Sequence, residues 1–165
     1  MPVELENILG ELGQRFKRVR SAVAVGFGSE EFRALSAFRG GLWMEAKAGE
    51  EIPFDDSQFE VAVIASGAVS REMVREANRV LISDGCLFFA VNEKRRSQEG
   101  YTPPEIYKLV REGFDILSVR SPKWWQFGFK GHMLSVCARK KAWRELRGFQ
   151  KDRAYIFAPF GGTKR

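Results

Sequence analysis

Two glycines, Gly26 and Gly28, flank Phe27 directly after the apolar run Ala22–Val25. Glycine has no Cβ, so a ligand can approach the backbone closely there, and the helix predicted to follow offers unpaired N–H groups in its first turn. The alternative is a tight strand-to-helix turn, in which Glu30 is a first-turn acid that interacts favourably with the helix dipole. The pattern therefore predicts either a ligand-binding loop or a simple turn.

Candidates for proton transfer lie in the second half of the chain. A histidine titrates near neutrality and suits a general base, and His132 is the single histidine of the chain. It follows a glycine at the start of a predicted strand, where the alternative is a structural role. Further candidates stand near the end of the apolar run Cys86–Val91, namely Asn92, Glu93 and Tyr101. Their spacing alone identifies no catalytic residue.

An aromatic cluster precedes the last predicted strand. It consists of Trp124, Trp125, Phe127 and Phe129, flanked by Lys123 and Lys130. Aromatic rings beside cations can stack on flat substrates or on nucleic-acid bases. The alternative is that the rings cover the edge of the sheet.

Strands and helices are predicted to alternate, as in an α/β sheet. Apolar runs without polar alternation indicate strands that are covered on both faces. The predicted strands are Ala22–Val25, Leu42–Ala46, Phe59–Ala65, Cys86–Val91, Phe114–Val119 and His132–Ala138. Apolar spacing predicts a helix over residues 4–19. Open parallel sheets bind ligands at the carboxyl ends of their strands.

The remaining helices are predicted from their start signals. Ser29 and Ser70 are candidate N-caps, and the helix after Ser70 should run to about Leu81. A turn at residues 83–85 should separate that helix from the next strand. Thr102 and Glu105 form a capping box around two prolines, which predicts a further helix.

Two segments resemble the second half of a class I S-adenosylmethionine (SAM)-dependent methyltransferase. Residues 49–66, GEEIPFDDSQFEVAVIAS, are similar to the family's "LPF.D..FD" segment, and residues 75–90, REANRVLISDGCLFFA, to its "RVL.PGG" segment. The resemblance covers about residues 20–140. It implies a three-layer Rossmann-like α/β fold with a mostly parallel sheet, helices on both faces and an antiparallel strand pair near the C-terminus.

The resemblance also implies that the chain is shortened by about one strand–helix unit. Only about twenty residues separate Gly28 from Gly49, where the family normally fits a strand, a helix and another strand. The segment Leu42–Ala46 can accordingly match either the second or the third strand of the family.

By the same resemblance, the cofactor is SAM and the protein is a transferase that methylates a small-molecule acceptor. The residues implied to hold the cofactor or line the reaction centre are Gly26, Phe27, Gly28, Glu30, Glu45, Ser66 and Gly67. Glu45 would bind the ribose, and Ser66 and Gly67 would lie beside the transferred methyl group. Ala24 stands where the family has an acid that meets the cationic amino-acid end of SAM, and Glu30, at the position of a family glycine, could supply that carboxylate instead.

These departures also allow a non-catalytic relative, either a binding or assembly module or a subunit that senses SAM without transferring its methyl group. Its partner would be RNA, another protein or a second copy of the chain. The chain is a basic protein with a net charge of +6. Basic residues cluster at Arg15, Lys17, Arg18 and Arg20, at Lys94, Arg95 and Arg96, and from Arg139 onward. Such clusters can bind acidic partners or can simply be solvated surface.

The length of 165 residues suits one domain, predicted over residues 1–142, followed by a basic aromatic extension over residues 143–165. The extension should cover apolar surface of its own domain or of a second subunit, giving a homo-oligomer. Cys86 and Cys137 lie in apolar runs and form no CxxC pair, so no metal site is predicted. The chain has no segment of the roughly 20 apolar residues that a membrane span needs, and a cytoplasmic location is expected.

Overall fold

A computed structural model describes residues 3–38, 40–49, 51–94, 99–120 and 133–142. The helices are α1 (Val3–Arg15), α2 (Ser29–Ser36), α3 (Arg71–Val80) and α4 (Pro103–Val110), with one 3-10 turn, η1 (Ser66–Ala68). The strands are β1 (Ser21–Val25), β2 (Leu42–Ala46), β3 (Phe59–Ile64), β4 (Leu81–Asn92), β5 (Phe114–Arg120) and β6 (Met133–Lys140). The predicted residues His132, Trp124, Trp125, Phe127 and Phe129, and the extension over 143–165, lie outside the described residues.

The described strands form one six-stranded sheet in the order β2-β1-β3-β4-β6-β5. Strands β2, β1, β3 and β4 are parallel, and β6 runs antiparallel to both of its neighbours, β4 and β5. This confirms the predicted α/β fold with an antiparallel arrangement near the C-terminus. Leu42–Ala46 pairs directly with β1 and therefore takes the place of the second strand. Among the described residues no strand lies beyond it, in agreement with the predicted loss of one strand–helix unit.

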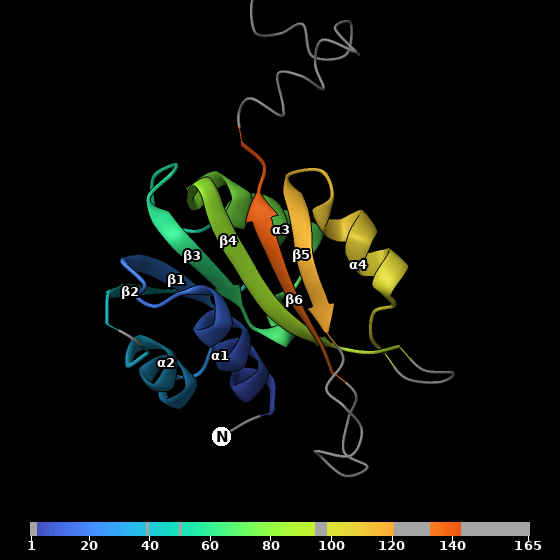
Figure 1. Ribbon diagram of the computed structural model, residues 1–165, viewed down its shortest axis with the longest axis horizontal. Coiled ribbons are helices and arrows are strands. Elements are labelled where there is room, and N and C mark those ends of the chain that lie inside the picture. The colour runs from blue at the N-terminus through green and yellow to red at the C-terminus, as the bar shows by residue number, and fades with distance from the viewer. Residues whose placement is uncertain (1–2, 39, 50, 95–98, 121–132, 143–165) are drawn as a thin grey trace, which may run out of the picture.

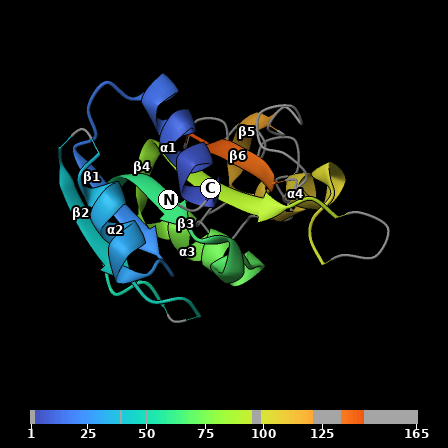
Figure 2. The same ribbon diagram turned by 90° about the horizontal axis from the view of Figure 1, so that it is seen from below.

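Helices cover both faces of the sheet, which gives the three layers visible in Figure 1 and, from below, in Figure 2. On one face, Leu5, Ile8 and Leu12 of α1 pack with Ala24 and Phe88 of the sheet in one apolar cluster. On the other face, α3 and α4 pack over the second apolar cluster. Alternate residues of each buried strand enter alternate clusters, which explains why these strands have no polar face.

Two predicted boundaries differ from the structure for identifiable reasons. The first helix was predicted over residues 4–19 but ends at Arg15. Phe16 and Val19 still pack into the cluster beneath α1, so the apolar spacing continues after the helix has ended. The second difference is in β4, which begins at Leu81, so the turn predicted at residues 83–85 is a kink within the strand. Its pairing with β3 jumps between Leu81 and Cys86, and Asp84 has a φ of 64°.

The N-cap of α2 is also one residue earlier than predicted. Gly28, rather than Ser29, occupies the cap, and its N–H donates to Glu31 Oε2 at 2.9 Å. The glutamate three residues after the cap accepts the backbone N–H of the cap residue, which is one half of a capping box. Glycine has no side chain to supply the other half. Glu31 therefore pairs one backbone N–H at the start of α2, that of Gly28.

Helix α4 begins with the predicted capping box. Glu105 Oε2 accepts the Thr102 N–H at 2.7 Å, and Thr102 Oγ1 accepts the Glu105 N–H at 3.4 Å. Replacing Thr102 with alanine is expected to lower the free energy of unfolding by about 1 kcal/mol. Chemical denaturation measures this change, and Thr102→Ser, which keeps the hydroxyl, should stay close to wild type. Equal losses in both variants would contradict the role of the cap.

Among the described residues, every helix is too short or too polar to cross a lipid bilayer. Both cysteines are buried free thiols in the cluster beneath α1.

Candidate ligand site at the carboxyl edge of the sheet

The segments after β1, β2 and β3 meet at one edge of the sheet because the three parallel strands end in register. Val25 pairs with Ala46 on one side and with Ile64 on the other. The backbone continues this pairing, because the Gly26 N–H donates to Ala46 O at 3.0 Å and the Ala65 N–H donates to Val25 O at 2.9 Å. We call this edge, with the residues that follow the three strands, the carboxyl rim.

Gly26 is required by the packing of the carboxyl rim itself. Its φ is +77°, and a Cβ built on it would lie 2.8 Å from Ala68 Cβ and 3.2 Å from Ala48 Cβ. The space that a side chain would fill is thus occupied by methyl groups that follow β2 and β3. The missing Cβ of Gly26 lets these segments close against β1, as expected for the tight turn that the sequence offered as one of two alternatives.

The rest of the predicted loop divides into buried and exposed parts. Phe27 is buried and packs in the cluster beneath α1. Glu30 is exposed in the first turn of α2. The acid that approaches the loop is its neighbour Glu31, which accepts the Gly28 N–H. The structure thus brings Glu31 to the loop backbone, and a ligand-binding role of Glu30 stays a prediction.

Glu45 lies at the carboxyl rim in β2, directly opposite Ala24 of β1. Its side chain is exposed, whereas Trp43, two residues earlier, is buried beneath the helices on that face. A carboxylate at this position can accept hydrogen bonds from hydroxyl groups of a ligand at the rim.

Ser66 and Gly67 form the start of η1, directly after β3. The Ser66 N–H donates to Glu4 Oε1 at 2.5 Å, and the Ser66 hydroxyl donates to Glu4 Oε2 at 2.9 Å. A Cβ built on Gly67 would have no other atom within 4 Å. The rim therefore has an open backbone position at Gly67, next to a carboxylate supplied by α1.

Glu4 is the rim residue that sequence reasoning missed. Burial raises the pKa of its carboxyl group above the ordinary value, the bonds from Ser66 lower it in part, and the negative charge of Glu31 raises it further. Topology could have predicted its place. Because α1 leads into β1 at the amino edge and is about 20 Å long, its first turn has to reach the carboxyl rim.

The proton-transfer candidate Asn92 ends β4, and the candidates Glu93 and Tyr101 pair with each other in the connection that follows it. The Tyr101 N–H donates to Asn92 O at 2.8 Å, and the Lys94 N–H donates to Tyr101 O at 3.0 Å. The Tyr101 hydroxyl donates to Val69 O at 3.2 Å, which ties this connection to the segment after β3. Tyr101 thus supports the carboxyl rim, and its hydroxyl proton is engaged by a backbone carbonyl.

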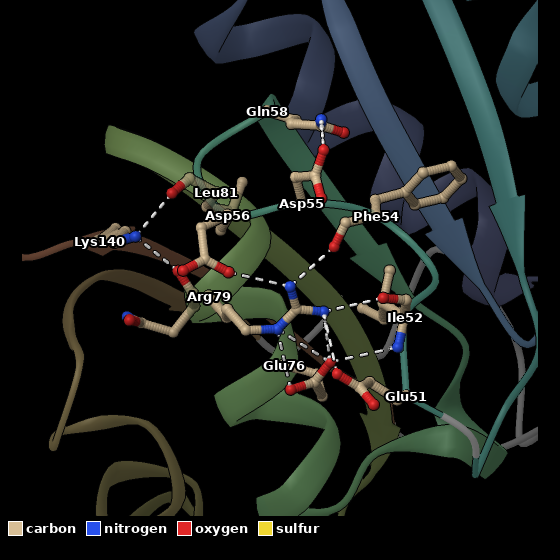
Figure 3. Close-up of polar contacts among 11 residues, drawn as sticks. Glu51, Ile52, Phe54, Asp55, Asp56, Gln58, Glu76, Arg79, Leu81 and Lys140 are labelled. Atoms are coloured by element: carbon tan, nitrogen blue, oxygen red, sulfur yellow. Dashed lines mark hydrogen bonds and ion pairs between the residues drawn. The ribbon is translucent and has the colours of Figure 1, made fainter.

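A second polar cluster lies at the opposite, amino edge of the sheet and is centred on Arg79 of α3 (Figure 3). Arg79 Nη1 donates to Phe54 O at 2.7 Å and to Asp56 Oδ1 at 3.0 Å. Arg79 Nη2 donates to Ile52 O and to Glu76 Oε2, each at 2.8 Å. We call this set the Arg79 cluster; it attaches the Ile-Pro-Phe segment to α3 and contains none of the predicted site residues.

A hollow of about 320 Å³ opens between α3 and α4 and includes Asn78, Leu109 and Gly113 in its lining. The Asn78 side-chain amide donates to Gly113 O at 2.9 Å, next to the start of β5. This hollow is therefore on the amino side of the sheet and contains none of the residues predicted to bind the cofactor.

No protein-family model matches the sequence, and no curated protein matches it. Solved structures do match in fold. The 1,6-didemethyltoxoflavin-N1-methyltransferase of Burkholderia thailandensis, solved with 1,6-didemethyltoxoflavin and S-adenosylhomocysteine, superposes with a TM-score of 0.64 at 16% identity, covering 83% of this chain and 78% of that chain. A putative sarcosine dimethylglycine methyltransferase from Galdieria sulphuraria gives 0.62 at 13% identity, covering 83% and 85%.

A third match is the complex between the Trm112 methyltransferase activator and a putative methyltransferase of Haloferax volcanii, with a TM-score of 0.61 at 15% identity, covering 84% of this chain and 90% of that chain. The chain therefore has the class I SAM-dependent methyltransferase fold. Identities of 13–16% show the fold alone.

Proposed function

We propose that the chain binds SAM at the carboxyl rim and transfers its methyl group to a small-molecule acceptor. The observation that carries the proposal is the convergence of Gly26, Glu45 and the Ser66–Gly67 turn at one edge of a methyltransferase-type sheet. This is the edge at which open parallel sheets bind their ligands.

The chemistry of the rim fits SAM at two points. Glu45 is an exposed carboxylate that can accept the ribose hydroxyls, and Gly67 leaves its backbone open to a ligand. SAM would supply an electrophilic methyl group on its sulfonium. Ser66 and Gly67 would border the reacting atoms without a bulky side chain, so an acceptor could approach in line. Alignment and exclusion of water can account for much of such a rate enhancement, so the proposal requires no general base.

The names of two matching proteins support a small acceptor. The Burkholderia enzyme is an N1-methyltransferase bound to 1,6-didemethyltoxoflavin, and a matching Thermotoga maritima protein is described as a possible histamine N-methyltransferase. Both names describe enzymes that act on small nitrogen compounds. We extend only the broad class, a small-molecule acceptor, to this chain.

Calorimetric titration of the full chain with SAM and with S-adenosylhomocysteine tests the proposal. Both ligands should bind. Glu45→Gln should lower both affinities by about tenfold, since a hydrogen bond to a charged group contributes about 1.5 kcal/mol or more. Glu72→Gln is the matched control, because Glu72 is an exposed glutamate in the first turn of α3. Absence of heat and of thermal stabilisation with either ligand at millimolar concentration would refute SAM binding.

A second candidate is a non-catalytic module that keeps the fold and binds RNA, protein or its own copy. It is favoured by hydrogen bonds within the protein at the rim. Glu4 accepts the Ser66 N–H and Glu31 accepts the Gly28 N–H, so these donors already have partners. In this alternative residues 1–142 would form the scaffold and the basic extension 143–165 would contact the partner. RNA binding would weaken steeply as salt rises. Self-association would appear as a concentration-dependent mass in solution.

A further inference from the structure

Glu4 carries a negative charge that its surroundings compensate poorly. Its carboxylate is half-buried at the carboxyl rim and is held by two hydrogen bonds from Ser66. In the described part of the chain, no lysine or arginine forms an ion pair with it. The raised pKa of this carboxyl group has burial as its main cause, and a buried carboxylate is stabilised most effectively by a cation.

A second carboxylate approaches the same place from α2. Glu31 accepts the Gly28 N–H and is close enough to Glu4 for their charges to repel. The two acids come from different helices, and each also contacts the backbone after a different strand, β1 for Glu31 and β3 for Glu4. The negative potential is thus concentrated above the gap between the ends of β1 and β3.

Because residue 24 is an alanine, β1 has no carboxylate at this position, and a carboxylate for a ligand would have to come from another element. The methyl group of Ala24 is fully buried in the apolar cluster beneath α1 and α2, so β1 itself offers no charged group to a ligand at its end. Helix α1 lies over this same face of the sheet, and its first turn carries Glu4 to the rim. Glu30, the substitute suggested by the sequence, is exposed in α2, and within the described part of the chain no hydrogen bond joins it to the rim.

We infer that Glu4 binds the ammonium group at the amino-acid end of the cofactor and so replaces the carboxylate that Ala24 cannot provide. This inference rests on the proposed SAM site. Glu4 would be a binding residue and would take no part in methyl transfer. Ser66 would orient its carboxylate through the N–H and the hydroxyl, which leaves the remaining acceptor sites of Glu4 for the ligand.

Two ligands that differ in this one end of the molecule test the inference. S-adenosylhomocysteine carries the ammonium group, whereas 5′-methylthioadenosine keeps the adenosine and the sulfur and lacks the amino acid. In the full chain, Glu4→Gln should lower the affinity for S-adenosylhomocysteine about tenfold, as expected for the loss of one charge-assisted hydrogen bond. The affinity for 5′-methylthioadenosine should not change. Glu30→Gln tests the competing carboxylate and should change neither affinity, and Glu72→Gln, at an exposed glutamate of α3, is the matched control.

The possible results separate the two proposals. If the wild-type chain binds neither ligand, the SAM site is refuted and the inference falls with it. If wild type binds both ligands but Glu4→Gln lowers the two affinities equally or not at all, the inference alone is overturned. A selective loss in Glu30→Gln would overturn it in favour of Glu30.

The titration of Glu4 gives a readout that needs no variant. With ¹³C-labelled glutamate, the Glu4 carboxyl should titrate above the ordinary glutamate pKa in the free protein. S-adenosylhomocysteine should lower that pKa because its ammonium favours the ionised form, and 5′-methylthioadenosine should not lower it. An equal response to both ligands would overturn the inference.

Discussion

Replacing Arg79 with methionine should lower the free energy of unfolding by about 3 kcal/mol, because hydrogen bonds to a charged group contribute about 1.5–3 kcal/mol each and their loss leaves acceptors unpaired. Methionine keeps most of the aliphatic stem and removes every donor. The carbonyl oxygens of Ile52 and Phe54 would lose the Arg79 guanidinium, and Glu76 would lose its cation. The Arg79 side chain is only 27% exposed, so water can replace these bonds only in part. Urea denaturation monitored by circular dichroism measures the change.

Arg75→Met is the matched control on the same helix. The Arg75 side chain is 63% exposed and pairs with Glu112 at 3.6 Å, and exposed pairs of this kind contribute about 0–1 kcal/mol. Arg79→Lys should lie between the two, because a lysine keeps the charge and loses the planar fork. Equal effects of Arg79→Met and Arg75→Met would show that the Arg79 cluster does not hold the Ile-Pro-Phe segment.

The same cluster gives an acid dependence with a defined sign. The hydrogen bond from Arg79 lowers the pKa of Glu76 below its ordinary value of 4.5. A carboxyl group whose pKa is lower in the folded state stabilises the fold above its unfolded pKa and loses this contribution as the pH falls through the folded pKa. The stability gap between wild type and Arg79→Met should therefore narrow as the pH falls below 4.5.

Gly26→Ala should also lower the free energy of unfolding by about 3 kcal/mol, since a left-handed backbone costs an alanine about 1–2 kcal/mol and overpacking adds about 1–3 kcal/mol. The φ of Gly26 is +77°, and the new methyl group would lie 2.8 Å from Ala68 Cβ. The segments after β2 and β3 would have to move outward to admit it. Thermal and chemical denaturation both measure this loss.

Gly67→Ala is the control for Gly26→Ala. It lies in the same rim, and its added Cβ would meet no other atom within 4 Å. Its stability should stay within about 0.5 kcal/mol of wild type. If Gly26→Ala were equally harmless, the close contact of Gly26 with Ala48 and Ala68 would not describe the folded protein.

Local patterns predicted the architecture well because each has a direct physical cause. The apolar strands needed cover on both faces, and the Thr102–Glu105 capping box formed as expected. Leu42–Ala46 was predicted to its exact bounds as a strand, while its position beside β1 required the pairing of the sheet. The end of α1 was wrong because Phe16 and Val19 continue to pack after the helix stops.

The candidate site was harder to predict because it depends on contacts between distant segments. The sequence could place Gly26 and Ser66 after two parallel strands, and these residues do lie at one rim. It could not show that Ala68 fills the space beside Gly26, or that Glu4 reaches Ser66 across 62 positions of the chain. The choice between Glu30 and Glu31 depended on a one-residue shift of the α2 cap, which is finer than sequence patterns resolve.

The Arg79 cluster and the carboxyl rim lie at opposite ends of the parallel strands, about 17 Å apart for a five-residue strand such as β1. Substitutions at such a separation usually have additive free energies, because they share no contacts. A double variant that combines Arg79→Lys with a rim substitution should show the sum of the two single changes. Changes at the amino edge and at the carboxyl rim can thus be combined, or engineered, one at a time with predictable total effects on stability.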